Sequence, residues 1–439
     1  ANDEDLLHPY GVDGAPAALL QGVGPNGVPS KAYLYFGLRR GGKAIYALNV
    51  TDPENPAMLW KISPSTAGFE KLALTFSRPQ IGRVTLAGVR TPVVIFAGGY
   101  DRNKDYYTGI QPKASGSTIR PIGTDDSTGT AIYVVNAETG ALIWTGTHAS
   151  LVDSIPTDLT IGDTTGDGTT DRIVFGDTGG NIWRADLAGD VTSEWSIHQV
   201  GRMGRHHVND KLNDRRFFHA PDVVKTKDSD GVAYDAIVIG TGDREDPLDR
   251  SGMVENFLYV IRDYNIFPLT KTEKADPNLA ERLAVVTHAD LVDITNCVPN
   301  DPDPACGTGF DNGWRMKLQI GPGEKNLSSP FTFSGTVFFT TYLPPGTIEA
   351  KTCGPSEGSG ALYAVNLEDG TPRFNFDSTT EETADGEATT TSDRYRLLSA
   401  GGIPSDVVYI GGGNLLLGDL SIIQGQVDNI RTYWRRSEE

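Results

Sequence analysis

The residues best suited to chemistry lie in one short acidic loop, GDTTGDGTTD, at positions 162–171. Carboxylates occupy loop positions 1, 5 and 9, as Asp163, Asp167 and Asp171, and Gly168 stands at position 6. A hard divalent cation such as Ca²⁺ prefers six to eight oxygen ligands held around a tight turn, and this spacing supplies such ligands. The loop therefore predicts a calcium site, and an acidic turn without metal is the alternative.

The expected ligands depart from an EF-hand at two positions. Position 3 is Thr165, whose hydroxyl is a weaker ligand than the usual Asp or Asn, and position 12 is Val174 in place of the closing glutamate. The flanking segments 159–161 and 173–175 alternate as strands do, so the loop is expected on a strand–loop–strand frame. The predicted metal ligands are Asp163, Thr165, Asp167, Thr169 (through its carbonyl) and Asp171.

A second acidic segment gives a weaker signal. Asp228, Asp230 and Gly231 resemble the first loop, but the glycine comes one residue too early, so an acidic turn between strands is favoured. His206 and His207 are adjacent and would point to opposite faces of a strand, which makes joint metal ligation awkward.

Two further polar segments, 99–105 and 242–246, each follow a strand-like run and are interpreted as salt-bridged turns or as contacts for a partner. The sequence contains no HExxH, GxSxG or Walker A motif. No catalytic residue is predicted, and the chain is expected not to be an enzyme.

One unit recurs along the chain and would position these loops. An apolar strand ends in glycine, a second strand ends in Asn or Asp, and a turn then leads to an aromatic strand. Copies begin at the segments 33–37, 93–98, 171–176, 236–240, 337–341 and 407–411. Repeated antiparallel units bury their apolar faces by stacking, which favours an all-β, modified β-propeller of six to eight blades over a set of β-sandwiches.

Three insertions interrupt the repeat, near 101–128, 265–312 and 377–393, and we expect 1–439 to form a single propeller domain cut from a longer protein. Within the second insertion, Asp276 and Pro277 predict an N-cap and first position of a helix, and a short helix is expected after Thr287. The third insertion is acidic and of low complexity.

The cysteines and the net charge limit the possible environments. Cys297 and Cys306 flank a Pro/Asp-rich loop and are predicted to form a disulfide, and three free thiols are the alternative. No partner is predicted for Cys353. The net charge of −19 argues against nucleic acid or an anionic membrane surface as a main partner. No apolar run approaches the roughly 20 residues of a membrane-spanning helix, and no signal peptide is recognised at the start.

Several of these segments together resemble one family, the C-terminal propeller domain of type IV pilus biogenesis proteins and adhesins of the PilY/PilC kind. The resemblance is carried by the segments 8–16, 162–171, 175–177, 180–184, 313–314, 323–325, 338–342, 362–366 and 431–435. It implies a modified propeller that binds Ca²⁺, with the five loop residues as ligands by position. It also implies a pilus-associated protein on the surface of a Gram-negative bacterium.

The resemblance further implies function and partners. Members of this family promote pilus extension by opposing retraction, and they contribute to twitching motility and host adhesion. The expected partners are type IV pilus components, such as minor pilins or the pilus tip, and host-cell receptors. Two alternatives stay open at this point: a quinone-dependent dehydrogenase, which is also a calcium-binding propeller, and a purely calcium-stabilised structural or lectin-like propeller.

Overall fold

In the computed structural model, β-strands are the predominant regular secondary structure of the described residues. The described residues are 10–24, 27–102, 125–204, 213–249, 254–298, 306–346, 357–376, 390–411, 414–416 and 422–424. These residues form six separate sheets, in which each strand pairs antiparallel with its neighbour in sequence almost throughout.

The first three sheets contain the N-terminal half of the chain. The first sheet comprises β1 (Ala17–Val23), β2 (Pro29–Gly37), β3 (Ile45–Asn49) and β4 (Ala57–Ile62). The second comprises β5 (Gln80–Leu86), β6 (Val89–Ala97), β7 (Ile132–Asn136) and β8 (Leu142–Gly146). The third comprises β9 (Thr160–Gly162), β10 (Arg172–Gly176), β11 (Asn181–Asp186) and β12 (Ser196–Arg202). The short strand β16 (Val286–Thr287) pairs parallel with the outer strand β12 of the third sheet.

The remaining three sheets follow in chain order. The fourth sheet comprises β13 (Asp222–Lys227), β14 (Ala233–Gly240), β15 (Phe257–Asp263), β18 (Gly313–Lys317) and β17 (Val292–Asp293). The fifth comprises β19 (Lys325–Asn326), β20 (Phe331–Phe333), β21 (Thr336–Leu343), β22 (Ser359–Asn366) and β23 (Tyr395–Gly401). The sixth comprises β24 (Val408–Gly411), β25 (Asn414–Leu416) and β26 (Ile422–Gln424).

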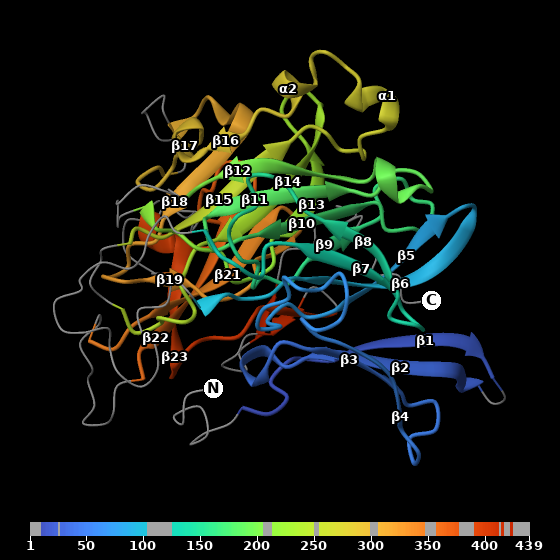
Figure 1. Cartoon of the computed structure of the whole chain (residues 1–439). Coiled ribbons are helices and arrows are strands. Elements are labelled where there is room, and N and C mark those ends of the chain that lie inside the picture. Colours follow the sequence, from blue (N-terminus) through green and yellow to red (C-terminus); the bar gives the residue numbers. More distant parts are fainter. Residues whose placement is uncertain are drawn as a thin grey trace.

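The sheets are arranged as a modified β-propeller, as the repeat predicts. In Figure 1 they follow one another from the blue sheet β1–β4 at the lower right, through the green sheets at the centre, to the orange and red sheet β19–β23 at the lower left. The core lies between sheets. One apolar cluster joins β6 and β7 to β10 and β11, and another joins β14, β15 and β18 to β21 and β22.

Aromatic side chains that end the units lie in this core, as expected. Trp183 and Trp314 are fully buried, and Trp60 is buried between the first two sheets. The glycine that ends the first apolar strand of the repeated unit also has a structural reason; in the sheets this strand is the second one, such as β2 or β10. A Cβ on Gly37 would lie 2.7 Å from the Thr75 carbonyl oxygen, and one on Gly176 would lie 2.6 Å from the Phe217 side chain. The segment that enters another sheet therefore passes too close for any larger residue.

The helices of the 265–312 insertion differ in detail from the prediction. The helix α2 (Leu279–Arg282) begins after Asn278, whose backbone N–H donates to the Asp276 side chain, and it ends before the strand β16. A helix that the sequence did not predict, α1 (Lys271–Lys274), starts from a capping box between Thr270 and Glu273. The segment after Thr287 forms one turn of 3₁₀ helix rather than a longer helix, because β17 follows directly.

The predicted disulfide between Cys297 and Cys306 is confirmed, with the two Cα atoms 5.5 Å apart. The turn before it is held by Arg394, whose guanidinium donates to the carbonyl oxygens of Ile294, Thr295 and Cys297 at 2.5–2.9 Å. Within the described part of the chain, no helix is long and apolar enough to cross a membrane. Cys353, His206, His207 and most of the 101–128 and 377–393 insertions lie outside the described residues.

Candidate metal centre

The predicted metal loop, 163–171, connects the strands β9 and β10 and so lies on a strand–loop–strand frame, as expected. Gly166 and Gly168 have φ angles of +76° and +83°, which L-residues with a Cβ rarely adopt. The glycine at position 6 is therefore required by the path of the backbone, as in a calcium-binding loop.

Asp163 organises the first half of the loop. One of its carboxylate oxygens accepts the backbone N–H of Gly166 at 2.6 Å, and the other accepts that of Gly168 at 2.7 Å. The Thr165 hydroxyl points toward the same carboxylate, at 3.4 Å. Positions 1 and 3 of the predicted ligand set are therefore brought together.

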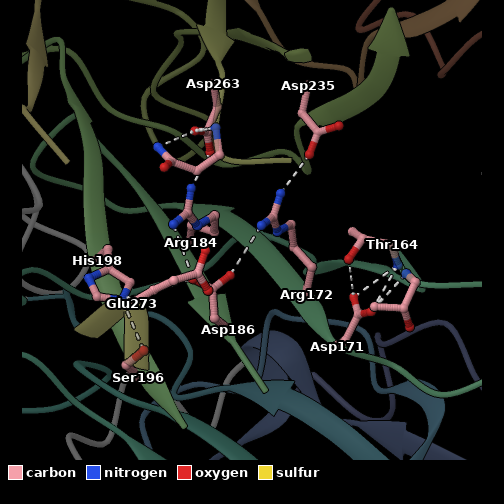
Figure 2. A network of polar contacts seen from close by, with 12 residues as sticks. Thr164, Asp171, Arg172, Arg184, Asp186, Ser196, His198, Asp235, Asp263 and Glu273 are labelled. Atoms are coloured by element: carbon pink, nitrogen blue, oxygen red, sulfur yellow. Dashed lines mark hydrogen bonds and ion pairs between the residues drawn. The ribbon is translucent and has the colours of Figure 1, made fainter. Parts of the chain in front are cut away.

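Asp171 closes the loop from its far end. Its carboxylate accepts the backbone N–H groups of Thr164 and Thr165 at 2.9–3.1 Å and the Thr164 hydroxyl at 2.8 Å (Figure 2). Burial raises the pKa of Asp171, and these hydrogen bonds oppose that rise. This carboxylate thus lies beside backbone atoms from the first half of the loop.

Asp167 points elsewhere in this structure. Its carboxylate accepts both the backbone N–H of Thr169, at 2.8 Å, and the Thr169 hydroxyl, at 2.5 Å. Among the residues that the structure describes, no three His, Cys, Asp or Glu side chains gather into a group able to hold a metal ion. The loop fits a hard cation in ligand chemistry and backbone path, whereas its three carboxylates do not converge here.

The neighbouring sheet supports the loop from outside. The Thr170 backbone N–H donates to the Arg83 carbonyl at 2.6 Å, and the Arg90 guanidinium donates to the Asp167 carbonyl. Both arginines belong to the hairpin β5–β6, so the predicted metal loop is held between two sheets. These contacts could not be predicted from the sequence, because they join residues 77 or more positions apart.

A buried ion-pair network begins at the residue next to the loop. The Asp171 side chain turns toward Thr164, and that of Arg172 turns the other way, to Asp235 in the next sheet, at 2.6 Å (Figure 2). Arg172 also lies 3.4 Å from Asp186, its direct cross-strand partner in β11. The end of the loop is therefore tied to the strand β14.

The network continues through a second arginine. Arg184 pairs with Asp186 at 3.1 Å and with Asp263 at 2.5 Å. Burial would raise the pKa of Asp263, but Arg184 and Arg172 together hold it below its ordinary value. Asp235 and Asp263 face each other across β14 and β15, so the two arginines neutralise a like-charged pair in the neighbouring sheet.

The acidic segment at Asp228 and the polar segment 242–246 form turns, as the sequence favoured, whereas residues 103–105 of the segment 99–105 lie outside the described residues. The Asp228 carboxylate accepts the backbone N–H groups of Asp230 and Val232 inside the hairpin β13–β14. In the segment 242–246, Asp243 pairs with Arg216 at 3.3 Å and Glu245 with Arg40 at 3.1 Å. The hydrogen bonds support the acidic turn predicted at Asp228, and the two ion pairs support the salt-bridged interpretation of the segment 242–246.

Comparison with known proteins gives a consistent result. Residues 5–200 match the family model of the PilY1 beta-propeller domain. The Type IV pilus biogenesis factor PilY1 homolog of Xylella fastidiosa is 24% identical over 365 residues, which is 77% of this chain and 22% of that protein. The Type IV pilus biogenesis factor PilY1 of Pseudomonas aeruginosa PAO1 is 29% identical over 191 residues, 43% of this chain and 14% of that protein.

The same family appears among solved structures. The crystal structure of the Pseudomonas aeruginosa PilY1 C-terminal domain superposes with a TM-score of 0.60 at 18% identity and covers 92% of this chain and 82% of that one. The predicted resemblance to the C-terminal propeller domain of these pilus biogenesis factors is therefore confirmed, in sequence and in fold. The aligned regions span less than a quarter of the length of the curated relatives.

Proposed function

We propose that this chain is the non-enzymatic, calcium-binding propeller module of a type IV pilus-associated protein. In this role it would support pilus extension by opposing retraction, and so twitching motility and adhesion to surfaces and host cells. Its partners would be pilus components such as minor pilins, and its location the outside of a Gram-negative cell. The observation that carries the proposal is the likeness to PilY1 across most of the chain, in sequence and in fold.

The metal loop supplies the chemical part of the proposal. Asp163, Asp167 and Asp171 would hold Ca²⁺ with their carboxylates, Thr165 with its hydroxyl and Thr169 with its backbone carbonyl. Bound Ca²⁺ supplies the positive charge that cancels the repulsion among the three carboxylates. Asp167 would first have to release the Thr169 hydroxyl, while Asp163 and Asp171 already hold the two ends of the loop together.

A change of the loop can reach the rest of the molecule through two contacts. Arg90 connects it to the sheet β5–β8, and Arg172 connects its last residue to β14. Calcium binding would therefore stabilise the packing of three neighbouring sheets and the surface that a pilus partner meets.

Titration calorimetry of Ca²⁺ into the purified chain tests the metal site. We expect Asp167→Ala to abolish binding, because it removes one of three carboxylates, and Thr165→Asp to tighten binding, because it adds a charged ligand. Asp230→Ala, in the exposed turn of the next sheet, is the matched control and should leave binding unchanged. An unchanged titration for Asp167→Ala would refute the site.

The pilus role needs a test in cells. Pilus assembly and twitching should fall when the full-length protein carries Asp167→Ala, with protein levels unchanged. Normal motility in that strain, despite the loss of calcium binding in vitro, would separate the pilus function from the metal and leave Ca²⁺ with a structural role only.

A further inference from the structure

A group of cationic side chains lies apart from the metal loop. Arg39 follows β2, Arg244 follows β14, and both therefore stand after the second strand of a sheet. Arg78 and His219 lie on the segments that enter β5 and β13. We call Arg39, Arg78, Arg244 and His219 the arginine cluster; all four are partly buried.

The other buried arginines of this chain have partners that compensate for the burial of their guanidinium groups. Four arginines are fully buried in the described residues, and each lies within 4 Å of a carboxylate: Arg172, Arg184, Arg215 and Arg216. Arg394 is also buried, has no carboxylate partner within the described ranges, and donates to three backbone carbonyls instead. Removing a guanidinium from water is costly, so pairing of this kind is expected.

The arginine cluster does not follow this pattern. None of its three arginines has a carboxylate within ion-pairing distance in the part of the chain that the structure describes. Arg244 donates to the Leu327 carbonyl at 3.4 Å and Arg78 to that of Pro16 at 3.2 Å. The Arg39 guanidinium stacks on the Phe76 ring, 5.2 Å from its centre. Among the described residues, no hydrogen-bond partner reaches the buried Nε atoms of Arg39 and Arg78 or the buried Nε2 atom of His219.

The ion pair between Arg40 and Glu245 places the segments of Arg39 and Arg244 side by side, and Arg39 and Arg78 both act electrostatically on Asp158. Burial lowers the pKa of His219 to about 3, and Arg244 and Arg39 lower it further. Burial also lowers the pKa of Arg244, with Arg39 and Arg40 acting in the same direction. An aromatic group, in which Phe76 contacts Tyr100 and Tyr100 contacts Phe218, connects the Arg39 side to the residue before His219.

Three carboxylates lie near the cluster, and each already accepts another hydrogen bond. Glu245 pairs with Arg40, Asp158 accepts the backbone N–H of Arg78, and Asp406 accepts that of Ser329. Burial raises the pKa of both Asp158 and Asp406, despite the neighbouring arginines. Among the described residues, these three carboxylates are thus engaged with groups other than the guanidinium groups of the arginine cluster.

We propose that the arginine cluster is a binding site for an oxyanion, a carboxylate or a phosphate group. Guanidinium groups present several N–H donors in a plane and bind such anions more strongly than they bind neutral acceptors. A bound oxyanion would accept the unused N–H groups of Arg39, Arg78 and Arg244 and cancel their mutual repulsion. The site is independent of the metal loop and of the proposed calcium function.

Calorimetry in calcium-free buffer at constant ionic strength tests the proposal, with inorganic phosphate in one arm and succinate in the other. At least one anion should bind saturably, with Kd in the millimolar range or tighter. Binding of phosphate or of succinate shows whether the site prefers a phosphate group or a carboxylate. Arg244→Gln and Arg39→Gln should each weaken that binding about tenfold. Arg202→Gln, at an exposed arginine at the end of β12, is the control and should not change it.

Thermal melting without the anion separates binding from a structural role. Arg244→Gln should melt no lower than the wild type, because it removes one of several like charges. The proposal is overturned if neither anion binds, or if Arg244→Gln binds as the wild type does. It is also overturned if that variant melts well below the wild type, since the arginine would then be needed for folding.

Discussion

Single buried carboxyl groups give the stability of this chain a pH dependence. Glu324 accepts the Thr341 and Tyr363 hydroxyls at 2.7 and 2.9 Å and the Ile320 backbone N–H at 2.7 Å. Burial is the largest effect on this group and raises its pKa from the ordinary value of 4.5 to about 7, although these hydrogen bonds oppose the rise. Between about pH 4.5 and 7, Glu324 is therefore protonated in the folded chain but ionised in the unfolded chain.

This pKa predicts a loss of stability as pH rises. Between about pH 4.5 and 7 the folded state binds more protons than the unfolded state, so the free energy of unfolding falls by up to about 3 kcal/mol from this group. Glu324→Gln cannot lose a proton and should remove that part of the fall. Urea denaturation at about pH 5 and pH 8 measures it, with exposed Glu281→Gln as control. The prediction would be contradicted if the free energy of unfolding fell equally between these two pH values for Glu324→Gln and the wild type.

Pairs of neighbouring sheets are joined by charge as well as by apolar packing. The strands β10 and β11 each contribute one arginine to the acidic pair Asp235 and Asp263 on β14 and β15. Burial raises the pKa of Asp235 to about 6, and Arg172 opposes the rise. Because neither partner reaches water, the connection is far less screened than an exposed ion pair.

Removing one partner should therefore be strongly destabilising. Asp235→Ala leaves Arg172 buried with only the more distant Asp186, and we expect the free energy of unfolding to fall by about 3–5 kcal/mol. Denaturant unfolding provides the measurement. Asp230→Ala, which removes an exposed carboxylate from the same hairpin, should cost less than about 0.5 kcal/mol. A loss below about 1 kcal/mol for Asp235→Ala would show that the network relaxes or admits water.

At the scale of the whole molecule, the metal loop contacts two sheets besides its own. Arg83 and Arg90 meet it from β5–β8, and Arg172 joins its end to β14. Its occupancy should then affect the unfolding of the entire chain and not of one hairpin alone.

Scanning calorimetry tests this coupling together with the prediction of a single domain. One cooperative transition is expected, and Ca²⁺ at about a hundredfold excess over Kd should stabilise it by about 2.7 kcal/mol. Asp167→Ala should melt in one transition that Ca²⁺ does not shift. Two separate transitions, of which only one responds to Ca²⁺, would contradict both the coupling and the single domain.

The sequence by itself determined the features that depend on near neighbours along the chain. The glycine-ended strands, the aromatic strand ends and the Cys297–Cys306 disulfide could be predicted from residue type and spacing, as could the frame of the metal loop. The helices at 271–282 were only partly predicted, because α1 starts from a capping box at Thr270 that was not recognised and α2 starts after Asn278 rather than Asp276.

Only the tertiary structure decided which distant charges meet. Arg172 and Asp235 are 63 residues apart, and a charged residue in an apolar strand gives at most a hint that a partner exists elsewhere. The contact of Arg90 with the Asp167 carbonyl and the gathering of Arg39, Arg78 and Arg244 likewise depend on how segments from different sheets approach. Local sequence fixes backbone conformation over a few residues, whereas packing between sheets sets the distances on which charge interactions depend.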